Sequence, residues 1–488
     1  WRVVQHLTVR KTTICNPNFA RLVDSLAVAP LQTLNLDGLS WAFTTRAAAM
    51  AAAVQRSPAR LASFMVGHSP VTLAVLRAFD PCVGEGLCEL RVPYAQLSDA
   101  SVIATWVRRN RGALRVLDLS RNKLRQGAVD LLASALGSGG INLESLDLSD
   151  NPIGDAGVVA LALSLSAWGR RLRSLALSKC WIEDQGAVAL AAALPACDAT
   201  LCSFSLHCNR IARDGAVALG RALPSRLADL QLHGNPLGDT GASAIALALA
   251  AGRGGALREL TLSSAGIQGA AVPALSKALE KCGPTLQVLR LARSRLAGLS
   301  ICEGALPRCR VLDISDAGLA GEDLAAVVRG IATAPVEYVA LRGNGAGPAG
   351  IRALAAAMRG WRFPRPSRLT LALDYNAMGD EGAQALADAI CAFGTPKLTL
   401  SLSLPWNNIS GVGFGALVRA ICASRVNLVH VLLHFNRIGD DSIPRLEEFV
   451  QTCGLRQLAL NDNSFSESGI AAVRRAFNRF LLEGHWYI

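Results

Sequence analysis

Histidines and cysteines are the first side chains in this sequence that could do chemistry. His207 and His233 each follow a leucine in two similar segments, and Cys208 is next to His207. Two imidazoles and a thiolate are donors that zinc accepts, and neighbouring strands could bring them within reach of one ion. Exposed polar residues on a strand surface are the favoured interpretation. We therefore predict no metal ligand and no cofactor.

Other catalytic patterns are not recognisable. The chain has seven His, and no Ser-His-Asp or Cys-His arrangement can be singled out. Two glycine-rich segments, 343–347 and 411–415, superficially resemble phosphate loops, but the sequence has no G-x-x-x-x-G-K-[ST] motif. We predict that the protein is not an enzyme and has no small-molecule substrate.

A short leucine-rich motif recurs along the chain, and the elements that it forms must position the histidines and cysteines. It is clearest at Leu143–Asn151, where Leu146 and Leu148 alternate as on one face of a strand. Asn151 stands where the strand must end, and a buried amide there can satisfy the backbone groups of the turn. Asp155 precedes an apolar run and is a predicted helix N-cap.

One such unit cannot bury its own leucines, so repetition is expected. About 17 units with a mean period near 28 residues can be marked by their first apolar position or its replacement. These positions are Val4, Leu31, Leu61, Leu87, Leu114, Leu143, Leu172, Leu201, Leu227, Leu257, Leu286, Cys309, Val336, Arg368, Thr399, Leu428 and Leu455. The asparagine is replaced at Cys180, Ala265, Ser294 and Ala317. The unit from Leu286 is short, and we predict a reduced helix at Leu299–Leu306.

These repeats resemble leucine-rich repeats of the ribonuclease-inhibitor type, the helix-bearing class of 28–29 residues. The resemblance covers nearly the whole chain and implies an α/β solenoid, a horseshoe with an inner parallel β-sheet and outer helices. We predict one domain over 1–488, with degenerate repeats at 1–113, regular repeats at 114–480 and a C-terminal tail at 481–488. The repeat serves many unrelated proteins, so the fold alone does not give the function.

Composition narrows the classes of partner. The net charge is +12, which favours acidic protein surfaces or RNA. No segment reaches the roughly 18 consecutive apolar residues of a membrane span, so no membrane partner is expected. The 13 Cys show no paired spacing and are interpreted as buried thiols in an intracellular protein.

Aromatic residues gather at one repeat position near the C-terminal end. The residue before the repeat asparagine is Tyr375, Trp406 and Phe435 in three consecutive units, and His430 and His434 flank the last of them. A stripe of stacked aromatic rings has the composition of an interface hot spot, and the ribonuclease-inhibitor class tends to use aromatics near this end. The alternative is that the rings fold down as local core.

An insertion near residue 360 forms a second candidate surface. Its arginines and aromatics are Arg359, Trp361, Arg362, Phe363 and Arg365. Arginine with aromatic rings can bind an acidic protein surface or nucleic acid. A solvated loop with a buried Trp361 is the competing interpretation.

The predicted function is a non-enzymatic scaffold that docks proteins within a larger intracellular assembly, such as a ciliary axoneme or a mitochondrial ribosomal particle. The cytoplasm or cytoskeleton is favoured over the mitochondrion. An alternative is a regulator of an enzyme, but the related GTPase-activating family has an acidic tail, whereas this chain ends with Arg474, Arg475 and Arg479. Ribonuclease inhibition is disfavoured because a basic protein repels a cationic nuclease, and RNA association is supported by charge alone.

Overall fold

The structure is a computed structural model. It describes residues 4–9, 16–38, 44–57, 60–68, 72–81, 83–299, 301–319, 321–361, 367–393, 398–424, 426–452, 455–480 and 485–487. A β-strand begins within two residues of each of the predicted repeat positions. The described strands pair in parallel and an α-helix follows most of them, which confirms an α/β leucine-rich repeat solenoid.

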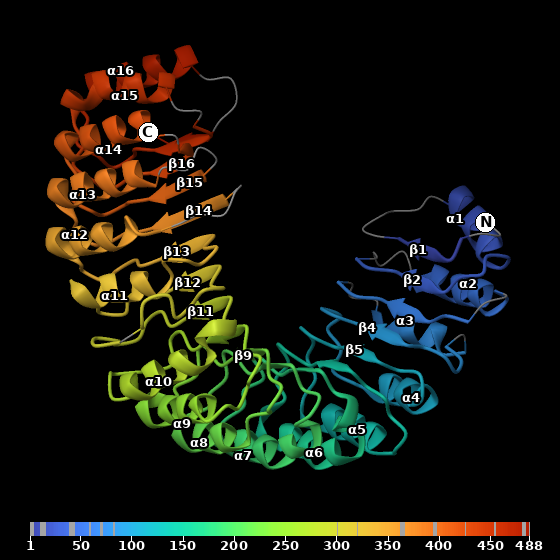
Figure 1. Ribbon diagram of the computed structural model, residues 1–488. Coiled ribbons are helices and arrows are strands. Elements are labelled where there is room, and N and C mark those ends of the chain that lie inside the picture. Colours follow the sequence, from blue (N-terminus) through green and yellow to red (C-terminus); the bar gives the residue numbers. More distant parts are fainter. Residues whose placement is uncertain are drawn as a thin grey trace. The chain divides into compact units, whose positions relative to one another are not determined.

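The chain divides into two compact units. Unit 1 comprises Trp1–Pro236 with Arg253–Gly255, and unit 2 comprises Leu237–Gly252 with Ala256–Ile488. Within each unit the helices lie along one side of the strands and leave the other side open (Figure 1). The prediction of a single domain and the prediction of a complete horseshoe both depend on how the two units are joined. Both therefore stay predictions.

Unit 1 holds the first nine strands and eight helices of the described chain. The strands are β1 (His6–Thr8), β2 (Thr33–Asn35), β3 (Ser63–Met65), β4 (Glu89–Arg91), β5 (Val116–Asp118), β6 (Ser145–Asp147), β7 (Ser174–Ala176), β8 (Ser203–Ser205) and β9 (Asp229–Gln231). The helices are α1 (Asn16–Leu26), α2 (Thr44–Gln55), α3 (Thr72–Phe79), α4 (Ser101–Arg109), α5 (Gln126–Leu136), α6 (Gly154–Trp168), α7 (Asp184–Ala193) and α8 (Arg213–Ala222).

Unit 2 continues this alternation, except that turns replace one helix among its described residues. Its strands are β10 (Glu259–Thr261), β11 (Val288–Arg290), β12 (Val311–Asp313), β13 (Tyr338–Ala340), β14 (Ser367–Ala372), β15 (Leu398–Ser403), β16 (Asn427–Leu432), β17 (Gln457–Ala459) and β18 (His485–Tyr487). Its helices are α9 (Gly238–Ala250), α10 (Val272–Cys282), α11 (Glu322–Gly330), α12 (Gly347–Met358), α13 (Gly379–Ala392), α14 (Gly411–Ala423), α15 (Ile443–Thr452) and α16 (Glu467–Phe480). Short 3-10 helices lie at Gly169–Arg171, Leu194–Cys197, Gly283–Thr285 and Asp440–Ser442.

The core of each unit is a stack of equivalent leucines. In unit 1 the register aligns Leu117 with Leu146, Leu146 with Leu175, and Leu175 with Phe204. These side chains are at most 1% exposed. Each repeat therefore buries its strand leucines against its neighbours, as the repeated phrase predicts.

The repeat asparagine acts as predicted. Asn151 Nδ2 donates to the backbone oxygens of Leu119 and Leu148 at 3.0 and 2.9 Å, and its Oδ1 accepts from Leu124 N at 3.0 Å. The amide thus joins its own turn to the preceding repeat. Where serine replaces it, the buried Ser294 Oγ has no hydrogen-bond partner among the described residues.

Two local predictions need correction. Asp155 lies inside α6, whose N-cap is Ile153 without a side-chain cap. Asp155 Oδ1 instead accepts from Glu183 N in the next repeat at 2.7 Å. The predicted helix at Leu299–Leu306 is replaced by turns in the described residues of this segment, because Gly298 and Gly304 adopt φ values of +79° and +68° that interrupt a helix.

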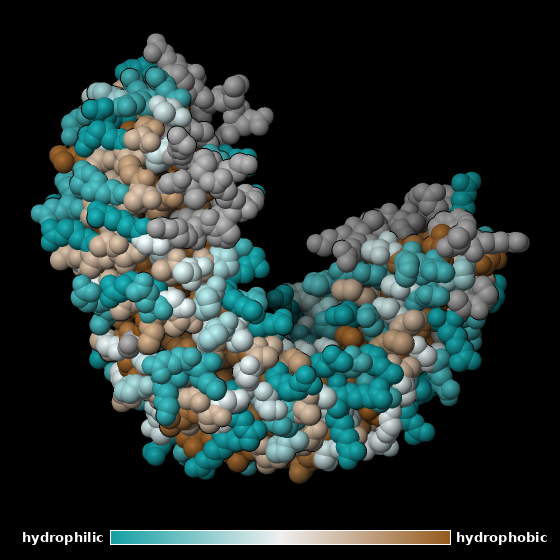
Figure 2. All heavy atoms as spheres, in the orientation of Figure 1, coloured by the Kyte–Doolittle hydropathy of each residue, from teal (hydrophilic) through white to brown (hydrophobic). Residues whose placement is uncertain are grey.

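The tail forms a strand that the leucine pattern did not indicate. β18 pairs in parallel with β17, with Leu458 opposite Trp486. Backbone hydrogen bonds need no leucine spacing, which explains why the sequence does not reveal it. Among the described residues, no helix combines the length and hydrophobicity needed to cross a membrane. Figure 2 shows hydrophilic residues over much of the helical surface in view, with hydrophobic residues in separate patches.

Candidate functional site

Each repeat turns sharply at one position, which we call the corner position: the residue immediately before the repeat asparagine or its replacement. Its backbone is left-handed, with φ between 49° and 59° wherever a described non-glycine residue stands there. These residues are His68, Tyr94, Arg121, Asp150, Lys179, Cys208, Ser264, Arg293, Asp316, Tyr375, Trp406, Phe435 and Asp462. Left-handed backbone is costly for a bulky side chain. Because the turn recurs in nearly every repeat, it belongs to the fold, and only the side chain differs between repeats.

Three consecutive corner positions of unit 2 carry stacked aromatic rings, which we call the aromatic ladder: Tyr375, Trp406 and Phe435. The ring centroids of Tyr375 and Trp406 are 5.4 Å apart with planes at 12°. Those of Trp406 and Phe435 are 4.4 Å apart with planes at 14°. The side chains are 57%, 46% and 37% exposed in chain order. The rings therefore lie on the surface and are not folded into the core.

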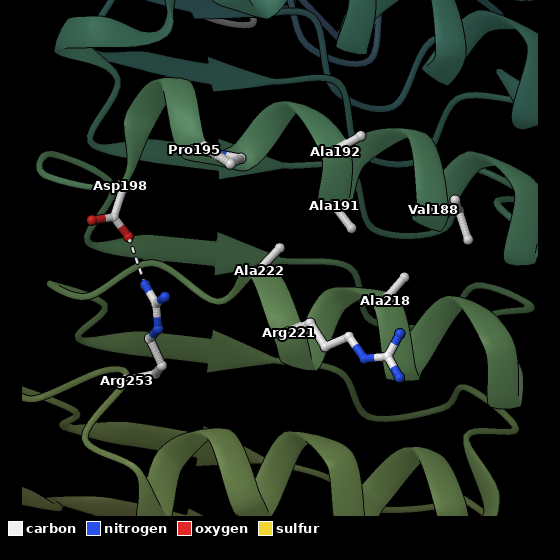
Figure 3. Close-up of a pocket in the computed structure, with 9 residues that line it drawn as sticks. All are labelled: Val188, Ala191, Ala192, Pro195, Asp198, Ala218, Arg221, Ala222 and Arg253. Carbon is white, nitrogen blue, oxygen red and sulfur yellow. Dashed lines mark hydrogen bonds and ion pairs between the residues drawn. The ribbon is translucent and has the colours of Figure 1, made fainter.

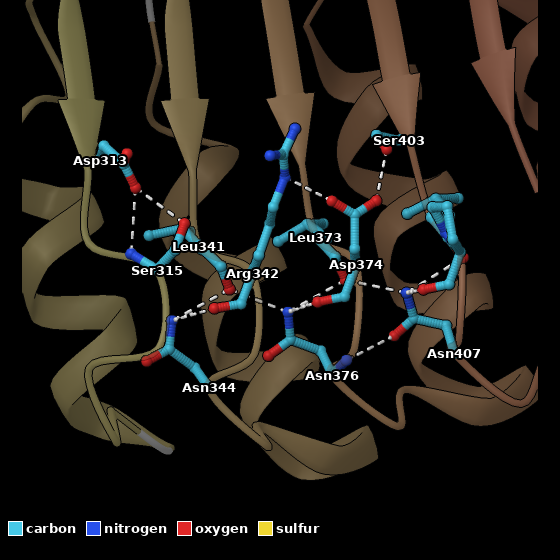
Figure 4. Close-up of polar contacts among 12 residues, drawn as sticks. Asp313, Ser315, Leu341, Arg342, Asn344, Leu373, Asp374, Asn376, Ser403 and Asn407 are labelled. Carbon is cyan, nitrogen blue, oxygen red and sulfur yellow. Dashed lines mark hydrogen bonds and ion pairs between the residues drawn. The ribbon is translucent and has the colours of Figure 1, made fainter. Parts of the chain in front are cut away.

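Buried amides hold the backbone beneath the ladder. Asn376 Nδ2 donates to Leu341 O and Leu373 O at 2.9 and 3.0 Å. Asn407 Oδ1 accepts from Asn376 N at 3.1 Å, which ties the first two rungs together. Figure 4 shows this chain of amides beneath β13, β14 and β15. The ladder is thus fixed by the fold before any partner binds.

A buried carboxylate lies directly before the first ring of the ladder. Asp374 Oδ2 is 2.5 Å from Arg342 Nε, and Asp374 Oδ1 accepts a hydrogen bond from Ser403 Oγ (Figure 4). The Asp374 side chain is 9% exposed, whereas that of Arg342 is 46% exposed. The pair neutralises the buried charge and leaves part of a guanidinium at the surface.

Of the two predicted histidines, His434 contacts the ladder and His430 lies on a neighbouring strand position. His434 meets Phe435 edge-on, with ring centroids 5.6 Å apart and planes at 72°. Its Nδ1 is buried without a hydrogen-bond partner among the described residues. His430, on β16, shares a hydrogen bond of 3.0 Å between its Nδ1 and Ser401 Oγ. Both imidazoles are half-buried, so His434 adds a polar edge beside the aromatic surface.

The second predicted surface changes character in the structure. Trp361 is 2% exposed, its Nε1 donates to Val328 O at 3.3 Å, and its ring stacks on Phe393 at 6.2 Å. Its placement at a contact surface is therefore corrected, because a buried ring cannot touch a partner. Arg359 is exposed at the end of α12. The remaining predicted residues, Arg362, Phe363 and Arg365, lie outside the described residues.

A smaller aromatic pair in unit 1 was missed by sequence reasoning. His68 and Tyr94 occupy neighbouring corner positions, with ring centroids 5.4 Å apart and planes at 21°. Tyr94 is 55% exposed, and His68 Nδ1 lies 2.7 Å from Asp37 Oδ1. Ala95 stands where the asparagine would mark the repeat, so the corner position was not recognised. Counting three residues from the expected strand end would have found it.

Unit 1 also has hollows on both of its sides. On the helical side, small residues of α7 and α8 leave a groove that ends at an ion pair, with Asp198 Oδ1 3.2 Å from Arg253 Nη1 (Figure 3). On the strand side, a polar groove contains His207, Lys179 and Asp147. Burial, together with the charge of Lys179, lowers the pKa of His207. Burial also raises the pKa of Asp147.

The repeats match a known family model. The leucine-rich repeat model matches residues 141–162, 171–191, 227–246 and 369–387. These segments contain strands and helices in the order that defines each repeat here. The chain is a leucine-rich repeat protein. Such repeats generally form non-enzymatic scaffolds with extended surfaces for protein binding. No curated protein sequence is similar enough to this chain to serve as a relative.

Several solved structures show a distant likeness at 13% identity. The match to a chain of the yeast Rad7–Elc1 complex spans 78% of this chain and 78% of that chain, with a TM-score of 0.44. The match to a leucine-rich repeat protein of Leptospira interrogans spans 99% of this chain and 100% of that chain, with a TM-score of 0.42. The Arabidopsis receptor kinase HAESA, solved with the peptide hormone IDA and the co-receptor SERK1, covers 89% and 67%, with a TM-score of 0.42. Likeness at this level supports no inference about partners.

Proposed function

We propose that this leucine-rich repeat protein is a scaffold that docks a protein partner on the aromatic ladder. One observation carries the proposal: Tyr375, Trp406 and Phe435 stack in the open at three consecutive corner positions. Exposed rings cost solvation free energy unless a partner covers them. Aromatic residues also supply much of the binding energy at interface hot spots.

The fixed backbone of the ladder favours tight docking. Binding normally costs about 0.5–1.5 kcal/mol for each side chain that it immobilises. The amides of Asn376 and Asn407 already hold the turns, and the stacked rings already restrict one another. Little ordering therefore remains when a partner covers them. The half-buried His434 ring, which meets Phe435 edge-on, borders the apolar surface at one end.

The charge of the chain bears on the kind of partner. A net charge of +12 favours a protein with an acidic surface around an apolar centre. Membership of the ribonuclease-inhibitor-like class is part of the proposal, supported by the helix-bearing repeat of about 28 residues. An intracellular assembly such as a ciliary axoneme or a mitochondrial ribosomal particle stays a prediction, as does the alternative role as regulator of an enzyme.

Trp406→Ala tests the proposal. The full chain and the variant are used to recover partners from native extract, and the recovered complex is then measured by gel filtration and titration. Loss of a central ring should weaken partner binding by about 2 kcal/mol, which is roughly 30-fold in Kd. The melting temperature should barely change because Trp406 is 46% exposed.

A matched control is available in unit 1. Trp181 is 56% exposed and has a φ of 60°, but it lies outside the aromatic ladder. Trp181→Ala should bind the partner like the unchanged chain. Equal binding by Trp406→Ala would refute the docking site, and a large fall in its melting temperature would show that Trp406 belongs to the core.

A further inference from the structure

Two neighbouring repeats of unit 1 bring His207, Cys208 and His233 together. Ser205 is opposite Gln231 in the register of β8 and β9, so the two histidines occupy equivalent positions just beyond these strands. Their rings stack with centroids 4.3 Å apart and planes at 9°. Cys208 N donates to His233 O at 2.8 Å, which fixes the cysteine beside the second histidine.

The three donor atoms converge. One nitrogen from each histidine and Cys208 Sγ all lie within 4.8 Å of one another. Zinc bonds of about 2.0–2.1 Å to nitrogen and 2.3 Å to sulfur place tetrahedral ligands roughly 3.5 Å apart. Binding one ion therefore requires the donors to approach one another by about 1 Å. It also requires the stacked imidazole rings to rotate about their side-chain bonds, so that both in-plane lone pairs point to the same ion.

The surroundings leave room for this arrangement. The next corner position is Gly234, and a Cβ there would lie 3.0 Å from Cys208 Sγ. A larger residue would displace the thiol, whereas glycine leaves it free beside His233. The site opens into the polar groove lined by Asp147, Lys179 and His207.

One polar atom at the site is unexplained by the protein itself. His207 Nδ1 is buried and has no hydrogen-bond partner among the described residues. Leaving such an atom unpaired carries a desolvation cost, because its hydrogen bond to water has been lost and not replaced. Stacking of two imidazoles does not remove that cost, but coordination of an ion through Nδ1 would.

We propose that His207, Cys208 and His233 bind one divalent transition-metal ion of the zinc type. Nitrogen and thiolate donors select zinc over calcium or magnesium, which take oxygen ligands. Lys179 opposes a cation near His207, while Asp147 attracts one. The Cys208 thiolate adds the negative charge that offsets Lys179. Three protein ligands leave a fourth position open to water in the groove.

Cobalt(II) titration of the full chain tests the site, since cobalt reports thiolate coordination by its ultraviolet charge-transfer band. The metal-free protein should bind one equivalent at this site, and zinc should displace the cobalt and abolish the band. Cys208→Ser should lose the band. Because disturbing even outer contacts of a metal site costs about 10–100-fold in affinity, loss of a ligand should weaken binding by at least about 100-fold.

Control variants separate this site from the other thiols. Cys302→Ser and Cys391→Ser remove exposed cysteines outside the cluster and should keep the full band. His233→Gln should lower the affinity for the metal without removing a thiol. Circular dichroism checks that each variant is folded. Absence of the band from the unchanged chain, or its full retention in folded Cys208→Ser, would overturn the proposal. If Cys208→Ser does not fold, unchanged affinity in His233→Gln has the same meaning.

Discussion

At the scale of single residues, the corner position combines a backbone conformation common to the repeats with a side chain that varies between them. Its left-handed backbone costs roughly 1–2 kcal/mol for an ordinary L-residue, and the repeats bear this cost with side chains as different as Asp150 and Trp406. The fold therefore fixes the backbone and leaves the side chain free to vary. Bulky rings at three successive corner positions are then a property of the surface, which is where we place partner binding.

The buried thiol of Cys180 gives a prediction for high pH. Burial raises the pKa of Cys180 from its ordinary value of 9.0 to about 12. Below pH 9 both states keep the proton, so the contribution of the neutral thiol to stability is complete. Between about pH 9 and 12 only the unfolded state releases it, and the free energy of unfolding should fall by about 1.4 kcal/mol per pH unit.

Cys180→Asn is the matched variant for this measurement. It restores the usual asparagine, whose amide can donate to Leu148 O, the atom that Cys180 Sγ now contacts at 3.3 Å. Urea unfolding at pH 7 should show a gain of about 1 kcal/mol for the new hydrogen bond. Between pH 9 and 11 the variant should lose less stability than the unchanged chain. An identical pH dependence would show that the thiol titrates normally.

At the scale of elements, an aspartate in one helix caps the helix of the next repeat. Asp184 Oδ1, in the first turn of α7, accepts from Ala212 N and Gly215 N at the start of α8, at 2.8 and 2.9 Å. A Cβ on Gly215 would lie 2.7 Å from that oxygen, so glycine permits the approach. The same arrangement recurs where Asp380 accepts from Ser410 N and Gly413 N. Helices of adjoining repeats are therefore coupled by their ends as well as by their apolar sides.

Asp184→Ala should destabilise unit 1 by about 1–2 kcal/mol, the usual cost of losing a helix cap. Asp214 is the control, because it lies in the first turn of α8 with its side chain 81% exposed and only a 4.0 Å contact to Arg213. Asp214→Ala should change stability by less than about 0.5 kcal/mol. Denaturant unfolding of both variants measures their free energies of unfolding. Equal losses of stability would mean that the Asp184 carboxylate acts only through the helix dipole.

At the scale of the whole molecule, charge and the aromatic ladder predict different behaviour in salt. The net charge of +12 attracts any polyanion, and such binding weakens steeply as salt displaces the protein from phosphates. Docking on aromatic rings buries apolar surface and depends little on salt. The two classes of partner can therefore be told apart without knowing the partner.

Binding to a generic RNA should fall by about 10³–10⁵ between 50 and 200 mM salt if six to ten phosphates are contacted. Binding of the protein partner recovered through Trp406 should change by less than about tenfold, because exposed ion pairs contribute little. Titrations of both ligands across this salt range provide the measurement. A salt-insensitive RNA affinity that Trp406→Ala abolishes would instead identify RNA as the ligand of the ladder.

The repeat register and the central core follow from the spacing of residues along the chain. Strand leucines alternate within a few residues, and the asparagine stands at a fixed distance from them, so Leu146 and Asn151 were placed correctly from spacing alone. Spacing also placed Tyr375, Trp406 and Phe435 at one repeat position, but it left open whether their rings are exposed or belong to the core.

The contacts between side chains of different repeats became visible in the folded chain and were not predictable from spacing. Asp155 accepts a hydrogen bond from the next repeat instead of capping its own helix. The buried Trp361 donates a hydrogen bond to Val328 O, 33 residues away. His207 and His233 became partners because the parallel register sets their strands side by side. Sequence spacing records neighbours along the chain, whereas these contacts depend on strand register, side-chain rotamers and the space left by residues such as Gly234.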